Sequence, residues 1–196
     1  MRPVPRETRE RLEQFAQLVL AENARQNLIA ASTATDFWNR HIVDSLQLLD
    51  HVPEFPQLWL DIGSGAGLPG LVVAIASDHR VVLAEPRRRR AEFLINCCDR
   101  LGLSEVIVEQ RRVETLHIAA DVVSARAVAS LDTLFGWATQ IGSADALMIL
   151  PRGANAVSEL DAARVAWHGD FDLAPSVTAP GSGIVLARHV RRRNAQ

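Results

Sequence analysis

The sequence contains no lysine, so all 21 of its basic residues are arginine. It also lacks any run approaching the roughly 18–20 apolar residues that a membrane-spanning helix needs. The first residues, Met1 to Arg6, lead into a charged stretch and not into the apolar core of a signal peptide. The lack of an apolar span and of a signal-peptide core predicts a cytoplasmic protein that has no membrane partner.

Cysteine is scarce as well, and the only two, Cys97 and Cys98, are adjacent. Neighbouring residues of a helix point in different directions, so a disulfide between them is not expected. The sequence has no Cys-x-x-Cys motif and no cluster of histidine and cysteine, so no metal site is predicted. We expect two buried free thiols.

The formal net charge of −2 argues against a protein that binds nucleic acid indiscriminately. The arginines nevertheless gather in three clusters, at 87–90, 111–112 and 188–193. One interpretation is a compositional bias toward arginine, with the side chains solvating helix faces. The other is contact with phosphate groups, which the guanidinium fork fits well. The sequence leaves both interpretations open.

The first 56 residues are predicted to form an N-terminal helical extension. Apolar residues recur at helical spacing over 6–24 and again from Phe37 to Asp50, where Asp36 is the expected N-cap. Pro53 and Pro56 then interrupt the chain. The remaining residues, 57–196, are expected to form the main domain, and the two parts to make one structural unit.

From residue 57 onward, short apolar strands alternate with helices. We predict strands at 58–62, 81–84, 106–108, 122–125, 146–150 and 184–190, and helices at about 68–77, 87–101, 131–141 and 155–165. Residues 175–183 are expected to form a loop or hairpin. The alternation is typical of an α/β, Rossmann-like fold with a mostly parallel, doubly wound sheet.

The most informative segment joins the first strand of this sheet to the helix that follows. It reads Asp61-Ile-Gly-Ser-Gly-Ala-Gly-Leu-Pro-Gly, and such a turn lies at the carboxyl edge of the sheet, where open α/β sheets bind ligands. The dinucleotide fingerprint G-x-G-x-x-G would require a third glycine at position 68, which is Leu68. The spacing therefore disfavours a nicotinamide site.

The acid in front of the glycines also argues against a dinucleotide. A pyrophosphate at a helix N-terminus favours amide donors, whereas Asp61 places a carboxylate nearby. S-adenosylmethionine instead carries a sulfonium and an ammonium group, which a carboxylate suits. Glu85, at the end of the second strand, can accept hydrogen bonds from the ribose hydroxyls of either cofactor. The structural alternative is a tight glycine turn with Glu85 as an exposed strand-end residue.

The pattern acid-x-Gly-x-Gly-x-Gly resembles motif I of class I methyltransferases, and other segments narrow the resemblance. Residues 27–28, 40–46, 61–70, 112–114, 124–127 and 152–153 resemble, in order, the Asn-Leu-Thr, Arg-His-Ile-x-Asp-Ser-Leu, cofactor-loop, Arg-x-Glu, Ser-Arg-Ala and Lys-Gly elements of one family. That family is the small-subunit ribosomal RNA guanine-N7 methyltransferases, also called glucose-inhibited division protein B. The match covers nearly the whole chain. It departs at Ile29, which replaces threonine, at Ala125, inserted in Ser-Arg-Ala, and at Arg152, which replaces lysine.

The resemblance implies a methyltransferase domain over 57–196 that binds S-adenosyl-L-methionine. The cofactor-binding residues that it implies are Asp61, Gly63, Ser64, Gly65, Gly67, Leu68, Glu85, Val113, Glu114 and Arg126. The implied substrate-binding residues are Asn27, Arg40, His41, Asp44, Ser45 and Arg152. For His41 a hydrogen bond within the N-terminal helices is an equal alternative, and Asn27 is equally suited to ending a helix.

No catalytic base is predicted. Guanine N7 carries no proton at neutral pH, so its attack on a methyl group needs no base. The fourth strand ends in Ser124-Ala125-Arg126. An Asn/Asp-Pro-Pro-aromatic motif at this place would resemble the amino-group methyltransferases, and the sequence does not have it.

The resemblance implies that the partner is ribosomal RNA within the small subunit, and the chain is expected to be a monomer. Because the N7 edge is hidden in the deep, narrow major groove of an RNA duplex, the target must lie in a loop or be turned out of its stack. Two other functions stay open at this point. One is a class I methyltransferase that acts on a protein or small molecule, and the other is a non-catalytic RNA-binding domain.

Overall fold

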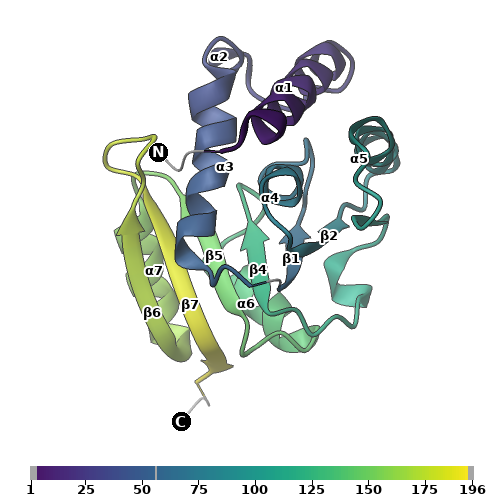
Figure 1. Cartoon of the computed structure of the whole chain (residues 1–196). Helices are drawn as coiled ribbons and strands as arrows, with labels where there is room; N and C mark the ends of the chain where they lie inside the picture. The colour runs from purple at the N-terminus through teal and green to yellow at the C-terminus, as the bar shows by residue number, and fades with distance from the viewer. Residues whose placement is uncertain (1–3, 56, 194–196) are drawn as a thin grey trace.

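The computed structural model describes residues 4–55 and 57–193, and a seven-stranded sheet runs through its centre (Figure 1). The strands are β1 Leu58–Ile62, β2 Arg80–Ala84, β3 Ile107–Glu109, β4 Val122–Ala125, β5 Leu147–Arg152, β6 Trp167–Pro175 and β7 Gly183–Arg192. Their spatial order is β3-β2-β1-β4-β5-β7-β6. The first five strands are parallel, while β7 is antiparallel to β5 and β6. The prediction of a mostly parallel, Rossmann-like sheet is confirmed.

Helices cover both faces of this sheet. On one face lie α4 Gly70–Ala76 and α5 Arg88–Leu101 together with the N-terminal helices, and on the other lie α6 Leu131–Gln140 and α7 Ala156–Ala166. Successive strand residues point to opposite faces. Trp59 and Leu83 thus belong to the first core, and Leu60 and Val82 to the second. The predicted strands β1 and β2 thus supply side chains to both cores.

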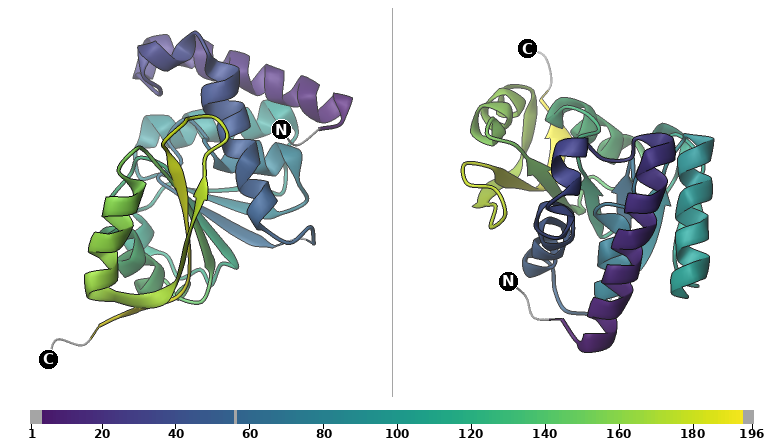
Figure 2. Two further views of the ribbon diagram at one scale, coloured as in Figure 1. Left: turned by 90° about the vertical axis from the view of Figure 1, so that its left-hand side faces the viewer. Right: turned by 90° about the horizontal axis from the view of Figure 1, so that it is seen from above.

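The N-terminal helix α1, Arg6–Gln26, packs against α4 and α5 on the first face. Seen from above, α1 and α5 lie side by side (Figure 2). Leu12, Phe15 and Val19, at helical spacing, are completely buried there. Each such side chain contributes about 1.5–3 kcal/mol when it is buried. The apolar stripe of α1 therefore shares its core with the sheet.

The second N-terminal segment departs from the predicted regular helix over 37–50. Helical structure already begins in α2, Ala31–Ala34, and then continues through a π-helical segment, η1 Trp38–Val43, into α3 Asp44–Leu46 and a 3₁₀ turn, η2 Gln47–His51. Asp36 does not cap a helix. Its carboxylate instead accepts a hydrogen bond from the side-chain amide of Asn39 at 2.9 Å. The chain turns at 35–36 without leaving helical geometry, which apolar spacing alone does not reveal.

The C-terminal part contains a strand that the sequence analysis missed. The predicted strand at 184–190 is confirmed as β7, but its hairpin partner β6 was not predicted. Trp167, Phe171 and Leu173 alternate with polar residues along β6, so the two-residue period is present in the sequence. Gly169, Asp170 and Asp172 disfavour a strand by propensity and conceal it.

The two cysteines lie in α5, buried and unpaired, as predicted. Burial raises the pKa of Cys97 to about 12 and that of Cys98 to about 11, so both thiols are protonated at neutral pH. Over residues 4–55 and 57–193, no helix combines the length and apolar character that crossing a membrane requires.

Candidate cofactor and substrate site

The glycine-rich loop follows β1 at the carboxyl edge of the parallel strands. Gly63, Gly65 and Gly67 all have positive φ angles, of 68°, 52° and 85°. The amide of Gly63 donates to the carbonyl of Ala84 at 2.8 Å, and the amide of Gly67 donates to the carbonyl of Ser64 at 2.7 Å. Residues that carry a side chain rarely adopt this left-handed backbone conformation, so the backbone of the loop by itself already requires glycine.

At Gly63 there is also no room for a side chain. A Cβ atom added there would lie 2.1 Å from Cγ2 of Val128, which belongs to the loop after β4. In that loop Ala127 also has a positive φ, of 54°. The loops after β1 and β4 therefore approach each other closely at Gly63.

Asp61 lies beneath the glycine loop and is only 1% exposed. Its Oδ1 accepts a hydrogen bond from Oγ of Ser124 at 2.6 Å, and its Oδ2 accepts one from the amide of Gly70 at 3.3 Å. The indole of Trp59 donates to the same Ser124 hydroxyl at 2.8 Å. Burial raises the pKa of Asp61 from 3.8 to about 6, although these hydrogen bonds and the nearby Arg126 charge oppose the shift. Asp61 fixes β1, β4 and the start of α4 relative to one another.

Glu85 ends β2 and holds the glycine loop from the opposite side. Its Oε2 accepts a hydrogen bond from the amide of Gly65 at 2.9 Å, and its Oε1 accepts one from the amide of Arg87 at 2.9 Å. The residue is 3% exposed, so the alternative of an exposed strand-end residue does not apply. A carboxylate can accept about four hydrogen bonds, which leaves capacity for a ligand.

A cavity of about 770 Å³ opens beside this loop, and we call it the glycine-loop cavity. Four of the predicted cofactor-binding residues line it: Gly63, Glu85, Val113 and Glu114. The other walls come from Ile62, Ala84, Pro86, Arg87, Arg90, Arg112, Ala127, Val128 and Trp137. The cavity therefore combines apolar walls with two carboxylates and a glycine backbone.

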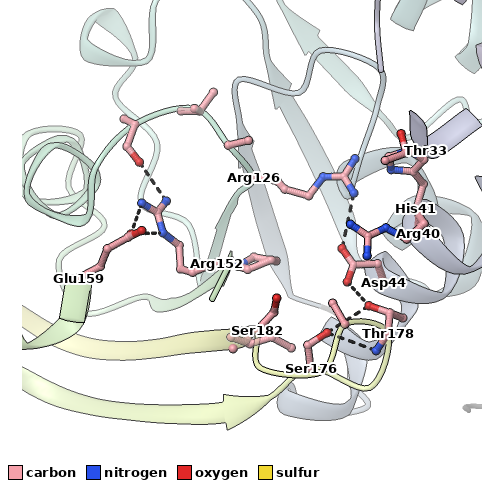
Figure 3. Close-up of a pocket in the computed structure, with 18 of the residues that line it drawn as sticks. Thr33, Arg40, His41, Asp44, Arg126, Arg152, Glu159, Ser176, Thr178 and Ser182 are labelled. Atoms are coloured by element: carbon pink, nitrogen blue, oxygen red, sulfur yellow. Dashed lines mark hydrogen bonds and ion pairs between the residues drawn. The ribbon is translucent and has the colours of Figure 1, made fainter. Parts of the chain in front are cut away.

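A second cavity, of about 570 Å³, lies between the N-terminal helices and the loop of the β6–β7 hairpin, and we call it the helix–hairpin cavity (Figure 3). Arg126 reaches into it from the end of β4, and its guanidinium lies 3.5 Å from the carboxylate of Asp44. The hydroxyl of Thr178, in the hairpin loop, donates to the other oxygen of Asp44 at 2.5 Å. Burial lowers the pKa of Arg126 below its usual value, although the carboxylates of Asp44 and Asp61 oppose this shift. Asp44 thus joins three distant segments at one wall.

His41 lines the same cavity and is 7% exposed. Its Nε2 lies 2.9 Å from the hydroxyl of Thr33, whereas its buried Nδ1 has no hydrogen-bond partner among the described residues. Burial lowers the pKa of His41 to about 4, and the charges of Arg126 and Arg40 add to the effect. The imidazole is therefore neutral at physiological pH. The contact with Thr33 matches the helix-internal role, and the ring also faces the cavity.

Arg152 forms the opposite wall, on a side chain that is 10% exposed. Its Nε donates to Glu159 at 2.7 Å, and its Nη1 donates to the carbonyl of Ala129 at 2.9 Å. It therefore connects the end of β5 to α7 and to the loop after β4. Arg40, Asp44, His41 and Arg152 come together in this cavity, and so does Arg126, which was predicted to bind the cofactor.

The remaining predicted residues line neither cavity. Asn27 ends α1 in a left-handed conformation, with φ of 50°, which agrees with its helix-ending alternative. Ser45 is buried, and its hydroxyl donates to the carbonyl of His41 within the helix. Those that shape the glycine loop from within are Asp61, Ser64, Gly65, Gly67 and Leu68. Their contact with a ligand stays a prediction.

Sequence reasoning missed the hairpin loop as part of the site. Gln47 accepts a hydrogen bond at its Oε1 from the amide of Val177 and donates to the hydroxyl of Ser176. Together with the bond between Thr178 and Asp44, these contacts attach the loop to η2 and α3. The hydroxyl residues within a glycine- and proline-rich loop are a weak signal, and nothing in the sequence states which helix they meet. Trp137 and Glu159, on α6 and α7, were missed for the same reason.

The fold has solved relatives at low sequence identity. A crystal structure of a mutant of MtNAS in complex with S-adenosylmethionine superposes with a TM-score of 0.64 at 16% identity, covering 92% of this chain and 75% of that one. A crystal structure of M. jannaschii TYW2 in complex with AdoMet superposes with a TM-score of 0.57 at 15% identity, covering 78% and 76%. These similarities show the fold.

Sequence comparison identifies the family. The ribosomal RNA small subunit methyltransferase G of Zymomonas mobilis is 43% identical over 195 residues, which cover 95% of this chain and 88% of that protein. The protein of the same name from Rhizorhabdus wittichii is 45% identical over 194 residues, covering 97% and 89%. A family model described as rRNA small subunit methyltransferase G matches residues 8–179. The chain therefore belongs to the rRNA small subunit methyltransferase G family.

Proposed function

We propose that this protein transfers a methyl group from S-adenosyl-L-methionine to N7 of a guanine in the RNA of the small ribosomal subunit. The observation that carries the proposal is the glycine-loop cavity, where Glu85 and Glu114 lie beside a glycine backbone in a member of this family. The adjoining helix–hairpin cavity supplies a second compartment for the acceptor. Ala127 and Val128 line both cavities, so the two compartments meet at the loop after β4.

The residues present fit an adenosine-containing cofactor. Glu85 retains acceptor capacity for ribose hydroxyls, and Glu114 can accept from an exocyclic amino group. Ile62, Val113 and Trp137 provide apolar surface for an adenine ring. Arg126, at the helix–hairpin cavity, would hold the carboxylate of the methionine part.

When bound, the cofactor supplies an electrophilic methyl group on a sulfonium. N7 of guanine offers a free lone pair and carries no proton at neutral pH, so the chain needs no general base for its methylation. The chain's own residues position the acceptor, and such positioning can supply much of the rate enhancement. Neutral His41 and the Arg126–Asp44 pair are suited to this task, because the methylated base is cationic and a free arginine charge beside it would oppose the reaction.

The helix–hairpin cavity, at about 570 Å³, is large enough for a single base turned out of an RNA strand. Its wall presents arginine donors and the Asp44 carboxylate, groups that can bond the polar edges of guanine. We propose that the chain acts in this way as a monomer in the cytoplasm, where the RNA of the small subunit is assembled and modified.

The test uses the protein with methyl-labelled cofactor and a small-subunit RNA transcript, followed by nucleoside analysis by mass spectrometry. Labelled 7-methylguanosine is the expected product. Label in a protein or small molecule, with none in RNA, would replace the proposal by another class I methyltransferase activity. Calorimetry that shows RNA binding without cofactor binding would indicate a non-catalytic RNA-binding domain.

A further inference from the structure

Five arginines gather where the end of α1 meets the start of α5, and the proposed function gives none of them a role. Arg25 comes from the last turn of α1, and the other four are Arg87, Arg88, Arg89 and Arg90. With Gln26 and Asn27 they line a hollow of about 420 Å³, which we call the arginine patch. The two helices that form it lie alongside each other (Figure 2).

The guanidinium groups of this patch are only partly used by the protein itself. Arg88 bonds Glu92, and Arg25 lies 3.4 Å from Glu22. Within residues 4–55 and 57–193, Arg87, Arg89 and Arg90 have no carboxylate partner. These three guanidinium groups thus lie close together, and none of them forms an ion pair with a described carboxylate.

The arginine run at the C-terminus differs in this respect. Arg191 lies 3.4 Å from Asp145, and Arg192 packs over the ring of Trp167. Arg193 donates to the carbonyls of Arg164 and Trp167. These three arginines therefore contact other parts of the fold, so arginine content alone does not create a free patch.

The position of the patch on α5 is unfavourable for cations. The first turn of a helix carries partial positive charge and favours acidic side chains. This 14-residue helix has no acidic residue in its first turn and begins with arginines instead. An anion bound at the patch would be attracted both by the guanidinium groups and by the helix terminus.

The patch is continuous with the proposed active site. Arg87 and Arg90 line both the patch and the glycine-loop cavity, and Nη1 of Arg90 lies 3.5 Å from where a Cβ of Gly65 would be. Because Ala127 and Val128 connect that cavity to the helix–hairpin cavity, the three hollows follow one another along the carboxyl edge of the sheet.

We propose that the arginine patch binds backbone phosphates of the RNA strand that flanks the target nucleotide. This inference rests on the proposed function. An RNA strand is an extended polyanion, so it can contact the patch while one of its bases enters the helix–hairpin cavity. The guanidinium fork suits phosphate oxygens, and the hollow also presents Asn27, the predicted substrate contact that lies outside both cavities.

The test compares two double variants with the wild type. Arg25→Gln with Arg89→Gln removes two charges from the patch, and neither residue lines the glycine-loop cavity. Arg164→Gln with Arg191→Gln removes two charges from exposed arginines outside the patch, which lie beside Asp161 and Asp145. Affinity for a small-subunit RNA transcript is measured over a salt series, and cofactor affinity by calorimetry.

We expect the patch variant to lose about tenfold in RNA affinity at 0.15 M salt and its salt slope to fall by roughly 1.4, the value for two single-strand phosphate contacts. Cofactor affinity stays at the wild-type value, and the control variant binds RNA normally. Equal slopes for all three proteins would overturn the inference while leaving methyl transfer to RNA intact. A patch defect in binding to assembled subunits but not to naked RNA would overturn it in favour of a protein partner. RNA binding that depends on the patch, without methyl transfer to RNA, would support the inference and refute the proposed function.

Discussion

The two cavities at the carboxyl edge of the sheet are built in different ways. The glycine-loop cavity takes its walls mainly from the ends of neighbouring parallel strands, and its shape depends on backbone conformation at Gly63 and Gly65. The helix–hairpin cavity takes its walls from segments as far apart as Thr33 and Ile184, joined through side chains such as Asp44. The first cavity is therefore determined by local motifs, and the second by long-range contacts between side chains.

The largest expected effect tests the backbone character of the glycine-loop cavity. Gly63→Val should lower cofactor affinity by more than 100-fold, because its Cβ would collide with Val128 and its φ of 68° disfavours a branched side chain. Gly102→Val is the matched control, since Gly102 has a φ of 62° but open space around it. Calorimetry measures cofactor affinity, and thermal melting measures stability. Comparing the two variants separates the collision with Val128 from the strain of a positive φ. Unchanged cofactor affinity in Gly63→Val would show that the loop is not the cofactor site.

The second test compares one buried titratable group from each region. Asp61, with its pKa raised to about 6, binds a proton more readily when folded, so its contribution to stability falls as pH rises from about 4 to 6. His41, with its pKa lowered to about 4, binds a proton less readily when folded, so its contribution rises between about pH 4 and 6.5. Each effect is about 3 kcal/mol, and their signs are opposite.

His41→Gln should therefore expose the dependence on Asp61. Relative to the wild type, the free energy of unfolding of this variant should fall by about 3 kcal/mol between pH 4 and 6.5. Asp61→Asn should show the reverse trend. Urea unfolding across this pH range measures both. A difference between variant and wild type that does not change with pH would mean that the buried side chain does not titrate as described.

A third test concerns the side chain that holds the glycine loop. Glu85→Gln keeps one acceptor oxygen but turns an amide N–H toward a backbone N–H donor, at Gly65 or at Arg87. Leaving a buried donor unsatisfied costs about 1–3 kcal/mol, so cofactor affinity should fall about 30-fold. The KM for RNA should stay unchanged, because Glu85 does not line the helix–hairpin cavity. An equal loss for both ligands would contradict the separation of the two regions.

The smallest expected effect is the converse change in the helix–hairpin cavity. Thr178→Val removes the hydroxyl that bonds Asp44, which should raise the KM for RNA about fivefold, the equivalent of about 1 kcal/mol, and leave cofactor affinity intact. Thr139→Val is the control, because the exposed Thr139 hydroxyl donates to the carbonyl of Gly136 within α6, outside both cavities. Identical KM values for both variants would show that the hairpin loop does not shape the substrate compartment.

The same distinction explains what the sequence could predict. The strands β1, β2, β4 and β5 were predicted because they are short apolar runs between helices, and the glycine loop because its spacing is local. Glu85 could be placed near the loop because parallel strands end at a common edge. The docking of Thr178 on Asp44 could not be predicted, since hydrogen bonds between side chains 134 positions apart leave no periodic signal.

Asp61 illustrates a subtler limit. The motif correctly places an acid beside the glycines, but the sequence cannot state where its carboxylate points. In the structure Ser124 and Gly70 bond both carboxylate oxygens, and the side chain lies under the loop instead of along the cavity wall. Motif spacing determines position along a strand, whereas orientation depends on partners from other strands.

The attachment of the hairpin loop to α3 has a consequence for how the molecule is completed during translation. A chain is synthesised from its N-terminus, and its earlier segments can fold first. The last residue that lines the glycine-loop cavity is Trp137, whereas Asp44 meets its hairpin partner only when Thr178 has been added. A nascent chain thus completes the walls of the glycine-loop cavity before those of the helix–hairpin cavity, and the second cavity has its full shape only when the last hairpin has closed.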